Sequence, residues 1–232
     1  MAERTPALHG RYCVVIPAYD AAATITEVIR RVRQQGLPVV VVDDGSRDHT
    51  AALASKEGAL VISHLRNEGK GCALRTGFEY ALRSHYDGVI TMDSDGQHDP
   101  SDIPQLIRAA EVQHAGMVLG NRMANGALMP PVRKRTNQLM SRVISVVTRQ
   151  RIPDSQCGFR LVRKEVLQDV PLRAKRFEIE SEMLFGAAAR RWKIISIPVK
   201  TIYAEHHRSH IRPVRETLRF LGALLRYLAR WR

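Results

Sequence analysis

The chain has 232 residues, of which 44% are hydrophobic and 25% charged. This length and composition exclude a disordered or fibrous chain and predict one globular domain, at most with an appendage. Basic residues exceed acidic ones by 13, so a polyanionic partner is expected: nucleic acid, an anionic membrane or a phosphorylated substrate.

The basic excess is concentrated in two stretches. Residues 122–151 carry seven basic side chains and no acidic one, and residues 208–232 carry seven basic side chains and one acidic one. The remainder of the chain is neutral. A protein that binds nucleic acid over its whole surface is not expected to show this pattern, so we expect no nucleic-acid partner.

The three cysteines, Cys13, Cys72 and Cys157, form no disulfide framework and have no zinc spacing. Their odd number indicates a reducing compartment. No apolar run reaches the roughly 18 residues that a membrane span needs. We therefore expect a cytoplasmic chain, either soluble or peripherally attached to the cytoplasmic face of the membrane.

Strand and helix patterns alternate along the first half of the chain. Short apolar runs typical of buried strands occupy residues 12–16, 39–42, 59–63, 87–92 and 117–120. Helices are predicted at residues 24–36, 46–58, 70–84 and 103–110, the first with a capping box of Thr24 and Glu27. Regularity ends near Arg122, after which helices at 138–148 and 180–191 and a strand at 194–199 are expected. This alternation predicts an α/β fold with a mostly parallel, Rossmann-like sheet flanked by helices.

Polar segments follow three of the predicted strands, at residues 17–20, 43–46 and 93–97. Ligands bind beyond the carboxyl ends of parallel strands, so these segments are expected to converge on one crevice. Asp93 and Asp95 are one residue apart, and both carboxylates can reach a hard cation such as Mg²⁺ or Mn²⁺. The alternative for this pair is a polar loop without a ligand.

Asp43-Asp44-Gly45-Ser46 follows a strand of four valines. Its carboxylates suit hydrogen bonds to a ribose or a base, and Gly45 permits a tight turn. The alternative is a capping cluster for the next helix, in which Ser46 or Asp44 is the cap and Asp48 complements the helix dipole.

Two further segments are less specific by themselves. Asn67-Glu68-Gly69-Lys70-Gly71 opens a helix, and a helix N-terminus with glycine and lysine favours phosphate, although the spacing of a Walker A loop is missing. Asp154 to Arg160, taken alone, is a turn before a strand.

These motifs, in this order and together with Pro17-Ala18-Tyr19, Gln97-His98 and Gly158-Phe159-Arg160, resemble the inverting family 2 glycosyltransferases of GT-A fold. Within that family the chain looks most like the dolichol-phosphate mannose synthase group, the polyprenyl-phosphate glycosyltransferases. The resemblance covers roughly residues 11–200. It implies a GT-A catalytic domain at residues 1–207 that moves a hexose from a nucleotide sugar, GDP-mannose or a UDP-sugar.

The resemblance also implies the donor site. The nucleotide would contact Pro17, Ala18, Tyr19, Asp43, Asp44, Lys70 and Asp93. A divalent cation, Mg²⁺ or Mn²⁺, would be held by Asp93, Asp95 and Gln97. The family usually continues Asn-Glu after Pro17-Ala18-Tyr19, whereas this chain has Asp20-Ala21, and this departure leaves the identity of the base open.

The acceptor site follows from the same resemblance. An acceptor phosphate would meet Arg122, Arg133 and Asn137, and the catalytic set would be Asp95, Arg122 and Asp154. A lipid phosphate is already ionised near neutral pH and needs little base catalysis, whereas a hydroxyl acceptor requires a base, for which Asp154 and Glu178 are the candidates. The acid-free stretch 122–151 favours the phosphate, and the alternative for this stretch is a solvated loop and helix face.

The C-terminal stretch, residues 208–232, is predicted to form a basic amphipathic helix. Its apolar stripe consists of Ile211, Val214, Leu218, Leu221, Leu225 and Leu228, and its arginines gather in one sector. Such a helix fits an anionic membrane interface. A helix docked on the body with a solvated arginine face explains the pattern equally well.

The sequence is therefore compatible with three functions. The leading one is metal-dependent, inverting hexose transfer to a polyprenyl or dolichyl phosphate at the membrane face. The second keeps the same donor with a saccharide or another hydroxyl acceptor. The third is a basic peripheral module that binds lipid or RNA on an inactive scaffold, and the intact Asp93-x-Asp95-x-Gln97 pattern argues against it.

Overall fold

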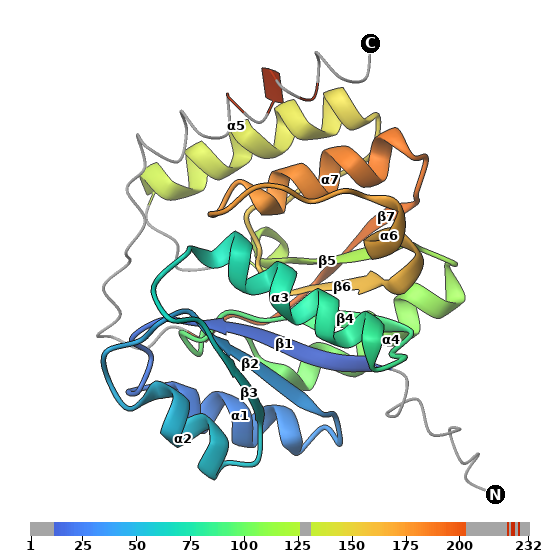
Figure 1. The fold of residues 1–232 in the computed structure, drawn as a ribbon. Helices are drawn as coiled ribbons and strands as arrows, with labels where there is room; N and C mark the ends of the chain where they lie inside the picture. Colours follow the sequence, from blue (N-terminus) through green and yellow to red (C-terminus); the bar gives the residue numbers. More distant parts are fainter. Residues whose placement is uncertain (1–11, 126–130, 203–221, 223, 226, 228–232) are drawn as a thin grey trace, which may run out of the picture.

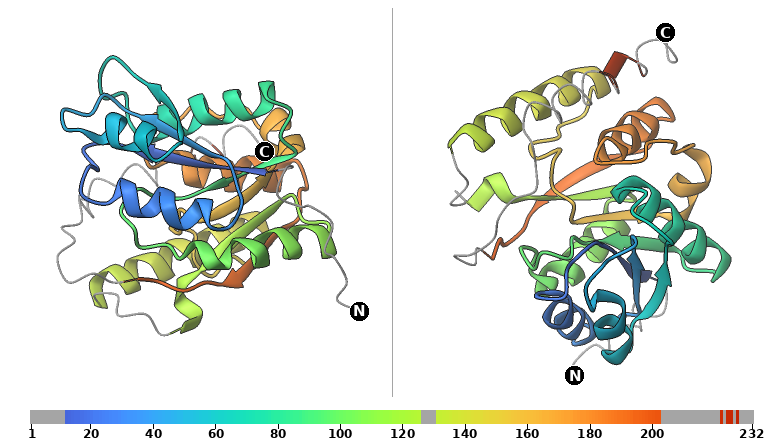
Figure 2. Two further views of the ribbon diagram at one scale, coloured as in Figure 1. Left: turned by 90° about the horizontal axis from the view of Figure 1, so that it is seen from below. Right: turned by 60° about the vertical axis from the view of Figure 1, so that its left-hand side comes forward.

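The computed structural model describes residues 12–125 and 131–202, together with Gly222, Leu224, Leu225 and Tyr227. A central twisted sheet has helices on both of its faces (Figure 1). Figure 2 shows the same layers from two further directions. This is the α/β class, with the mostly parallel flanked sheet, that the sequence predicts.

The described sheet has seven strands in the order β3-β2-β1-β4-β6-β5-β7. The strands are β1 (Tyr12–Ala18), β2 (Val39–Asp43), β3 (Leu60–Ser63), β4 (Gly88–Thr91), β5 (Met117–Asn121), β6 (Arg160–Arg163) and β7 (Ile194–Pro198). Strand β6 runs antiparallel to both of its neighbours, β4 and β5, and every other pairing is parallel.

Helices connect most of these strands. They are α1 (Ile25–Arg33), α2 (Thr50–Lys56), α3 (Lys70–Arg83), α4 (Ile103–Val112), α5 (Pro131–Thr148), α6 (Lys164–Asp169) and α7 (Ile179–Ala189). Two short 3-10 helices are η2 (Pro100–Asp102) and η3 (Arg122–Asn125).

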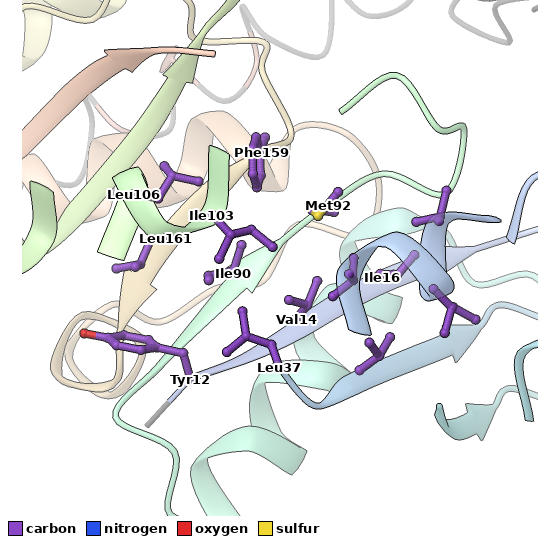
Figure 3. Packing of buried hydrophobic residues seen from close by; sticks show 14 of the residues in the cluster. Tyr12, Val14, Ile16, Leu37, Ile90, Met92, Ile103, Leu106, Phe159 and Leu161 are labelled. Carbon is purple, nitrogen blue, oxygen red and sulfur yellow. The ribbon is translucent and has the colours of Figure 1, made fainter. Parts of the chain in front are cut away.

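Alternate residues of each central strand supply two separate cores, because successive side chains of a strand point to opposite faces of the sheet. On β1, Val14 and Ile16 pack with α1 and α4, and Figure 3 shows this cluster. Cys13 and Val15 face the other way and pack with α3, α5 and α7. Both faces of the sheet are therefore covered, which explains why its strands read as continuous apolar runs.

Thr24 does not form the predicted capping box. Its hydroxyl makes no cap hydrogen bond to α1 and instead donates to the carbonyl oxygen of Ser94 at 2.6 Å. Thr24 thus ties the start of α1 to the turn after β4. This long-range contact cannot be recognised from the local sequence pattern.

The second half of the chain shows two differences from the prediction. Helix α5 begins at Pro131 rather than near residue 138, as suits proline in the first turn of a helix. The strand expected after the turn that ends at Arg160 is β6, and it is followed at once by α6, which the sequence analysis did not predict. Helix α6 has only six residues and is too short for its periodicity to stand out.

Most of the predicted C-terminal helix lies outside the described residues. Of the part that is described, Leu224 and Tyr227 pack against the core on the α5 and α7 side, and the Tyr227 ring stacks on Phe185 with centroids 4.7 Å apart. Leu225 is exposed. These contacts agree with docking of this segment on the body, while the arginine sector remains a prediction.

Within the described ranges, no helix combines the length and apolar character that crossing a membrane requires. All three cysteines are free and buried. Burial raises the pKa of the Cys13 and Cys157 thiols to about 12 in each case, so both are neutral thiols at physiological pH.

Candidate active site

The predicted crevice forms where β1, β2 and β4 end. Strand β1 is paired with β2 up to Ala18 and Asp43, and the backbone N–H of Met92, just beyond β4, donates to Val15 of β1. The turn from Asp93 to Gln97 therefore leaves the sheet beside the end of β1. A small pocket at this point is lined by Pro17, Lys70, Leu74, Thr91, Met92, Asp93, Gly158, Arg160, Glu180 and Met183.

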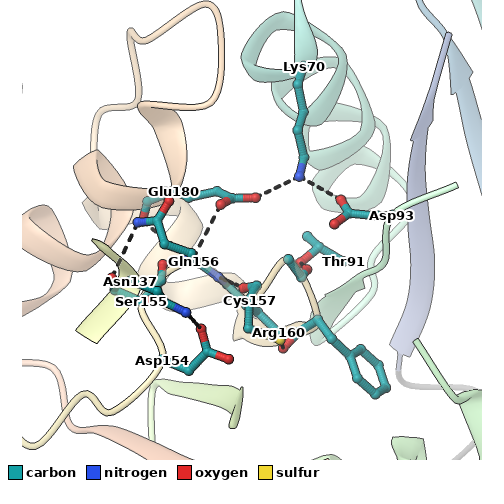
Figure 4. A network of polar contacts seen from close by, with 12 residues as sticks. Lys70, Thr91, Asp93, Asn137, Asp154, Ser155, Gln156, Cys157, Arg160 and Glu180 are labelled. Atoms are coloured by element: carbon teal, nitrogen blue, oxygen red, sulfur yellow. Dashed lines mark hydrogen bonds and ion pairs between the residues drawn. The ribbon is translucent and has the colours of Figure 1, made fainter. Parts of the chain in front are cut away.

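Lys70 lies at the centre of one charged network, which we call the Lys70 network and define as Lys70, Asp93 and Glu180. The ammonium Nζ is 2.5 Å from Oδ1 of Asp93 and 2.6 Å from Oε1 of Glu180. Figure 4 shows it reaching from the start of α3 between the two carboxylates. It also lies over the Phe177 ring, 5.5 Å from the centroid. Despite burial, the two carboxylates raise the pKa of Lys70 above its ordinary value.

Asp93 is held in its charged form. Burial alone would raise its pKa, but the Lys70 ammonium and a hydrogen bond from His98 hold that pKa well below its usual range. Nε2 of His98 is 3.4 Å from Oδ2 of Asp93, and its ring stacks on Phe159. Nδ1 of His98 has no hydrogen-bond partner in the described part of the chain, so we assign the proton to Nε2, where it has an acceptor.

Asp95 and Gln97 complete the acidic turn. The backbone N–H of Gln97 donates to Oδ1 of Asp95 at 3.0 Å, and the carbonyl oxygen of Gln97 accepts from Ile202. Thr24 holds the middle of the turn through Ser94. The turn is thus anchored on both sides, while the side chains of Asp93, Asp95 and Gln97 remain partly exposed.

The predicted cation ligands are two carboxylates and one amide on a single turn. Across the described ranges, no group of three or more histidine, cysteine, aspartate or glutamate side chains is placed to hold a metal by itself. Two carboxylates on one anchored turn, both reachable from solvent, nevertheless fit a cation such as Mg²⁺ that takes only one or two protein carboxylates and completes its shell with phosphate and water. The residues present therefore fit a metal shared with a diphosphate.

Asp44 neither caps a helix nor faces open solvent. Its carboxylate accepts hydrogen bonds from the backbone N–H groups of Glu68 and Gly69, at 3.0 and 2.8 Å, and contacts Nδ1 of His64. Asp44 thereby fixes the loop that leads into α3 and presents Lys70. The preceding residue, Asp43, is buried at the end of β2.

The capping alternative for this segment is wrong for Ser46 as well. Helix α2 begins at Thr50 without a side-chain cap on its N-cap residue, and Oγ of Ser46 accepts from the backbone N–H of Asp20. Asp48 does accept from Thr50 at that helix start. Gly45 makes the tight turn at φ +71°, where a Cβ would lie 2.5 Å from the backbone of Arg66.

The predicted base-pocket residues lie along the end of β1. Pro17 lines the small pocket with Lys70. Ala18 is buried and accepts from the backbone N–H of Asp44, whereas Tyr19 is 42% exposed. The residue that departs from the family pattern, Asp20, accepts from the backbone N–H of Arg47 at 2.8 Å. It thus joins the first loop to the second.

A second charged network, here the Arg122 network, consists of Arg122, Asp154 and Asn137. Nε and Nη2 of Arg122 donate to the two carboxylate oxygens of Asp154 at 2.8 and 3.0 Å, and Nδ2 of Asn137 donates to Oδ1 at 2.7 Å. All three residues are at most 5% exposed. Burial opposes the charge of Asp154, but the hydrogen bond and charge of Arg122 lower its pKa below the ordinary value.

The two networks are neighbours. Gly158 lies in the turn that follows Asp154, and a Cβ on it would be 2.5 Å from Oδ2 of Asp93. The Thr91 hydroxyl, at the end of β4, donates to the carbonyl oxygen of Gly158 at 2.7 Å. Three predicted residues from distant parts of the chain, Asp93, Arg122 and Asn137, are therefore brought to one region. Arg133 lies in the first turns of α5, and its side chain is outside the described set.

Two backbone N–H groups at the N-terminus of α3 are already engaged and are not free to bind a phosphate. The backbone N–H groups of Gly71 and Cys72 donate to the carbonyl oxygen of Lys175 at 2.9 and 3.2 Å. The segment before α7 thus covers this helix end, and the Lys70 side chain is the group that this motif presents to the pocket.

Arg160 has a positioning role that the sequence reasoning missed. Its guanidinium donates to three backbone carbonyls, of Ser155, Cys157 and Glu180, at 2.7 to 2.8 Å. This fixes the turn before β6 against the start of α7 (Figure 4). Within that turn, a Cβ on Gly158 would lie 2.5 Å from Oδ2 of Asp93. The only sequence signal was the Gly158-Phe159-Arg160 run, which carries no information on long-range partners.

Comparison with known proteins defines the class. In fold, the chain matches glucosyl-3-phosphoglycerate synthase from Mycobacterium tuberculosis, solved with Mn²⁺, uridine diphosphate and glucosyl-3-phosphoglycerate. The TM-score is 0.70 at 21% identity, over 93% of this chain and 79% of that one. The architecture is that of a GT-A glycosyltransferase.

Sequence comparison gives the family. Residues 13–170 match Glycosyl transferase family 2, and the chain belongs to this family. It is 32% identical to the UDP-N-acetylglucosamine–dolichyl-phosphate N-acetylglucosaminyltransferase of Methanococcus voltae, over 83% of this chain and 86% of that protein. It is 29% identical to the undecaprenyl-phosphate mannosyltransferase of Micrococcus luteus, over 84% and 85%. The predicted resemblance is confirmed.

Proposed function

We propose that the protein transfers a hexose, with inversion, from a nucleoside diphosphate sugar to a polyprenyl or dolichyl phosphate at a membrane face. Two relatives that align over most of their length carry names that specify a lipid phosphate as acceptor. The observation that carries the proposal is the close approach of Asp93 to Gly158, in the turn that follows Asp154, because Asp154 hydrogen-bonds to Asn137 of the acid-free helix α5.

The donor would bind at the Lys70 network and the acidic turn. A cation such as Mg²⁺ or Mn²⁺ held by Asp93, Asp95 and Gln97 would neutralise the charge that develops on the departing nucleoside diphosphate. Lys70 supplies a positive charge beside the same site. Asp93 contacts Lys70 directly, so a cation on Asp93 would share this carboxylate with the ammonium, and Glu180 is the second partner that holds the ammonium in place.

We propose a phosphate as the acceptor because Asp154, one of the two candidate bases for a hydroxyl acceptor, is poorly suited to accept a proton. Both oxygens of Asp154 accept hydrogen bonds, it is 1% exposed, and its pKa is lowered. A carboxylate in this state is a poor proton acceptor for a sugar hydroxyl. We therefore assign Asp154 a positioning role: it orients Arg122 and Asn137 toward the acceptor side.

Glu178 is the other candidate base for a hydroxyl acceptor. It precedes α7, and its Oε2 is buried without a hydrogen-bond partner among the described residues. If a hydroxyl compound were the acceptor, Glu178→Gln would lose most transfer activity. With a lipid phosphate as acceptor, the same variant keeps activity close to that of the wild type.

The deciding experiment compares acceptors. Purified protein is incubated with Mn²⁺ and with GDP-mannose, UDP-glucose or UDP-N-acetylglucosamine, and with either undecaprenyl phosphate or a panel of sugars and glycerol derivatives. We expect a glycosylated lipid phosphate by mass spectrometry with one of the donors, and loss of this product in Asp95→Asn. Transfer to hydroxyl compounds alone would overturn the assignment of the acceptor but not that of the donor site.

A further inference from the structure

Helix α5 presents two opposite faces. Its inner face lies against the body, where Asn137 and Ser141 hydrogen-bond to Asp154 and Ser155 and where Ile144 joins the core. The spacing of the buried residues 137, 141, 144 and 148 is that of one helix stripe. Figure 1 shows α5 at the outside of the molecule, next to α7.

The outer face of α5 is apolar and basic at once. Val132, Leu139 and Val146 recur every seven residues and are 71%, 64% and 77% exposed. Arg135 and Arg142 are exposed and lie between them on the same side of the helix. We call these five residues the outer stripe of α5. Large apolar side chains this exposed, in a row, mark an interaction surface.

The composition of the outer stripe selects its partner. No acidic residue occurs between positions 122 and 151, so two copies of this face would repel each other. A partner that accepts aliphatic side chains and also supplies negative charge along the whole helix fits better. The interface of an anionic bilayer has both properties, since acyl chains lie directly beneath phosphate groups.

We propose that the outer stripe of α5 docks the protein on anionic phospholipid bilayers, with the helix lying in the plane of the interface. The leucine and valine side chains enter the boundary of the acyl chains, and the two arginines bind lipid phosphates. The inference goes beyond the proposed function because it needs no sugar transfer.

Docking through the outer stripe of α5 would bring the bilayer close to the Arg122 network. Because Asn137 on the inner face contacts Asp154, the bilayer would lie about one helix diameter, roughly 10–12 Å, from the Arg122 network. A phosphate on a membrane lipid then has a short path to that network. The same helix would thus position the protein and form one wall of the site.

The test is flotation of the full-length protein with vesicles of phosphatidylcholine alone and of phosphatidylcholine mixed with phosphatidylglycerol, without nucleotide sugar. Val146→Asp is compared with Val112→Asp, because Val112 ends α4 on the opposite face of the sheet and is 70% exposed. A double variant of α5, Arg135→Gln with Arg142→Gln, is compared with a control double variant, Arg83→Gln with Arg108→Gln. The control removes two exposed arginines from α3 and α4.

We expect the wild type and both controls to float with the anionic vesicles only. The two-arginine variant of α5 should bind about 25-fold more weakly, from roughly fivefold for each arginine. Val146→Asp should weaken binding at least about tenfold. Melting temperatures close to that of the wild type show that these surface variants are folded.

Equal losses in the α5 variants and their controls would overturn the proposal, as would full binding by both α5 variants. Sedimentation that shows a concentration-dependent dimer, lost in Val146→Asp and unaffected by vesicles, would identify a second copy as the partner instead. None of these outcomes depends on sugar transfer, so failure of the docking surface and failure of the proposed enzyme are distinguishable.

Discussion

The Lys70 network and the Arg122 network both contain ion pairs near the turn at Asp93, but their carboxylates differ in hydrogen bonding and in exposure to solvent. In the Arg122 network, both oxygens of Asp154 accept hydrogen bonds, and Asp154 is 1% exposed. In the Lys70 network, one ammonium is shared by two carboxylates, and the side chain of Asp93 is 29% exposed.

The difference indicates different roles. A buried, fully hydrogen-bonded pair is costly to break, since removing one partner leaves an uncompensated charge. A partly exposed carboxylate with a shared partner can exchange that partner for a ligand. We therefore interpret the Arg122 network as the frame of the acceptor side and the Lys70 network as the part that rearranges when the donor binds.

The largest effect on stability is expected from removing the Arg122–Asp154 ion pair. Asp154→Ala should lower the free energy of unfolding by about 3–5 kcal/mol, because it leaves the Arg122 guanidinium buried without its counter-ion. Glu57→Ala is the matched control: Glu57 pairs with Arg30 in the same two-bonded geometry, but Arg30 lies at the surface. Urea unfolding of both variants measures the contrast. Equal losses would show that Asp154 is not a framework residue.

The next effect concerns the acidic turn. Asp95→Asn should reduce sugar transfer at least about a hundredfold, because a cation ligand loses its charge. Its stability should stay within about 0.5 kcal/mol of the wild type, since the described partner of Asp95 is one backbone N–H within its own turn. Calorimetry of nucleotide-sugar binding with and without Mn²⁺ checks the cause. Binding that ignores Mn²⁺ in both proteins would contradict the assignment.

The frame also predicts a response to acid. The pKa of Asp154 is lowered in the folded state, so its contribution to stability is complete above the unfolded-state pKa of about 4. That contribution is lost as the pH falls from there through the folded-state pKa. Asp154→Asn should therefore show a shallower loss of stability below about pH 4 than the wild type. Parallel pH profiles of the two proteins would contradict this.

The smallest effect tests the tether of the acidic turn. Thr24→Val removes the hydroxyl that holds Ser94 and should weaken Mn²⁺-dependent nucleotide binding about fivefold, from roughly 1 kcal/mol for one hydrogen bond. Thr136→Val is the control, because that hydroxyl donates within α5. A loss of the same size in both variants would exclude a role for the tether.

Much of the fold could be predicted because strand signals in this chain are strong. Four consecutive valines and the Pro17-terminated run of β1 are buried on both sides, and such runs need no tertiary information to be recognised. The six-residue helix α6 was not predicted. A strand was expected after Arg160, but the antiparallel direction of β6 and its place between β4 and β5 depend on partners far along the chain.

The sequence predicted which residues belong to the site but not the hydrogen bonds that join them. The ordered motifs identified Asp93, Arg122, Asn137 and Asp154. That three of these form one buried network follows only from the packing of α5 against the turn before β6. Asp44 shows the same limit: its carboxylate binds the loop before α3, a role that composition and spacing do not distinguish from contact with a ribose.

The most direct test of the proposed function is the configuration of the product lipid. Purified full-length protein is given an α-linked nucleoside diphosphate hexose and undecaprenyl phosphate with Mn²⁺, and the anomeric linkage of the product is determined by NMR. Attack by the acceptor phosphate from the face opposite the departing diphosphate predicts a β-linked hexose on the lipid phosphate. An α-linked product, or no lipid product with any donor that binds, would contradict the account.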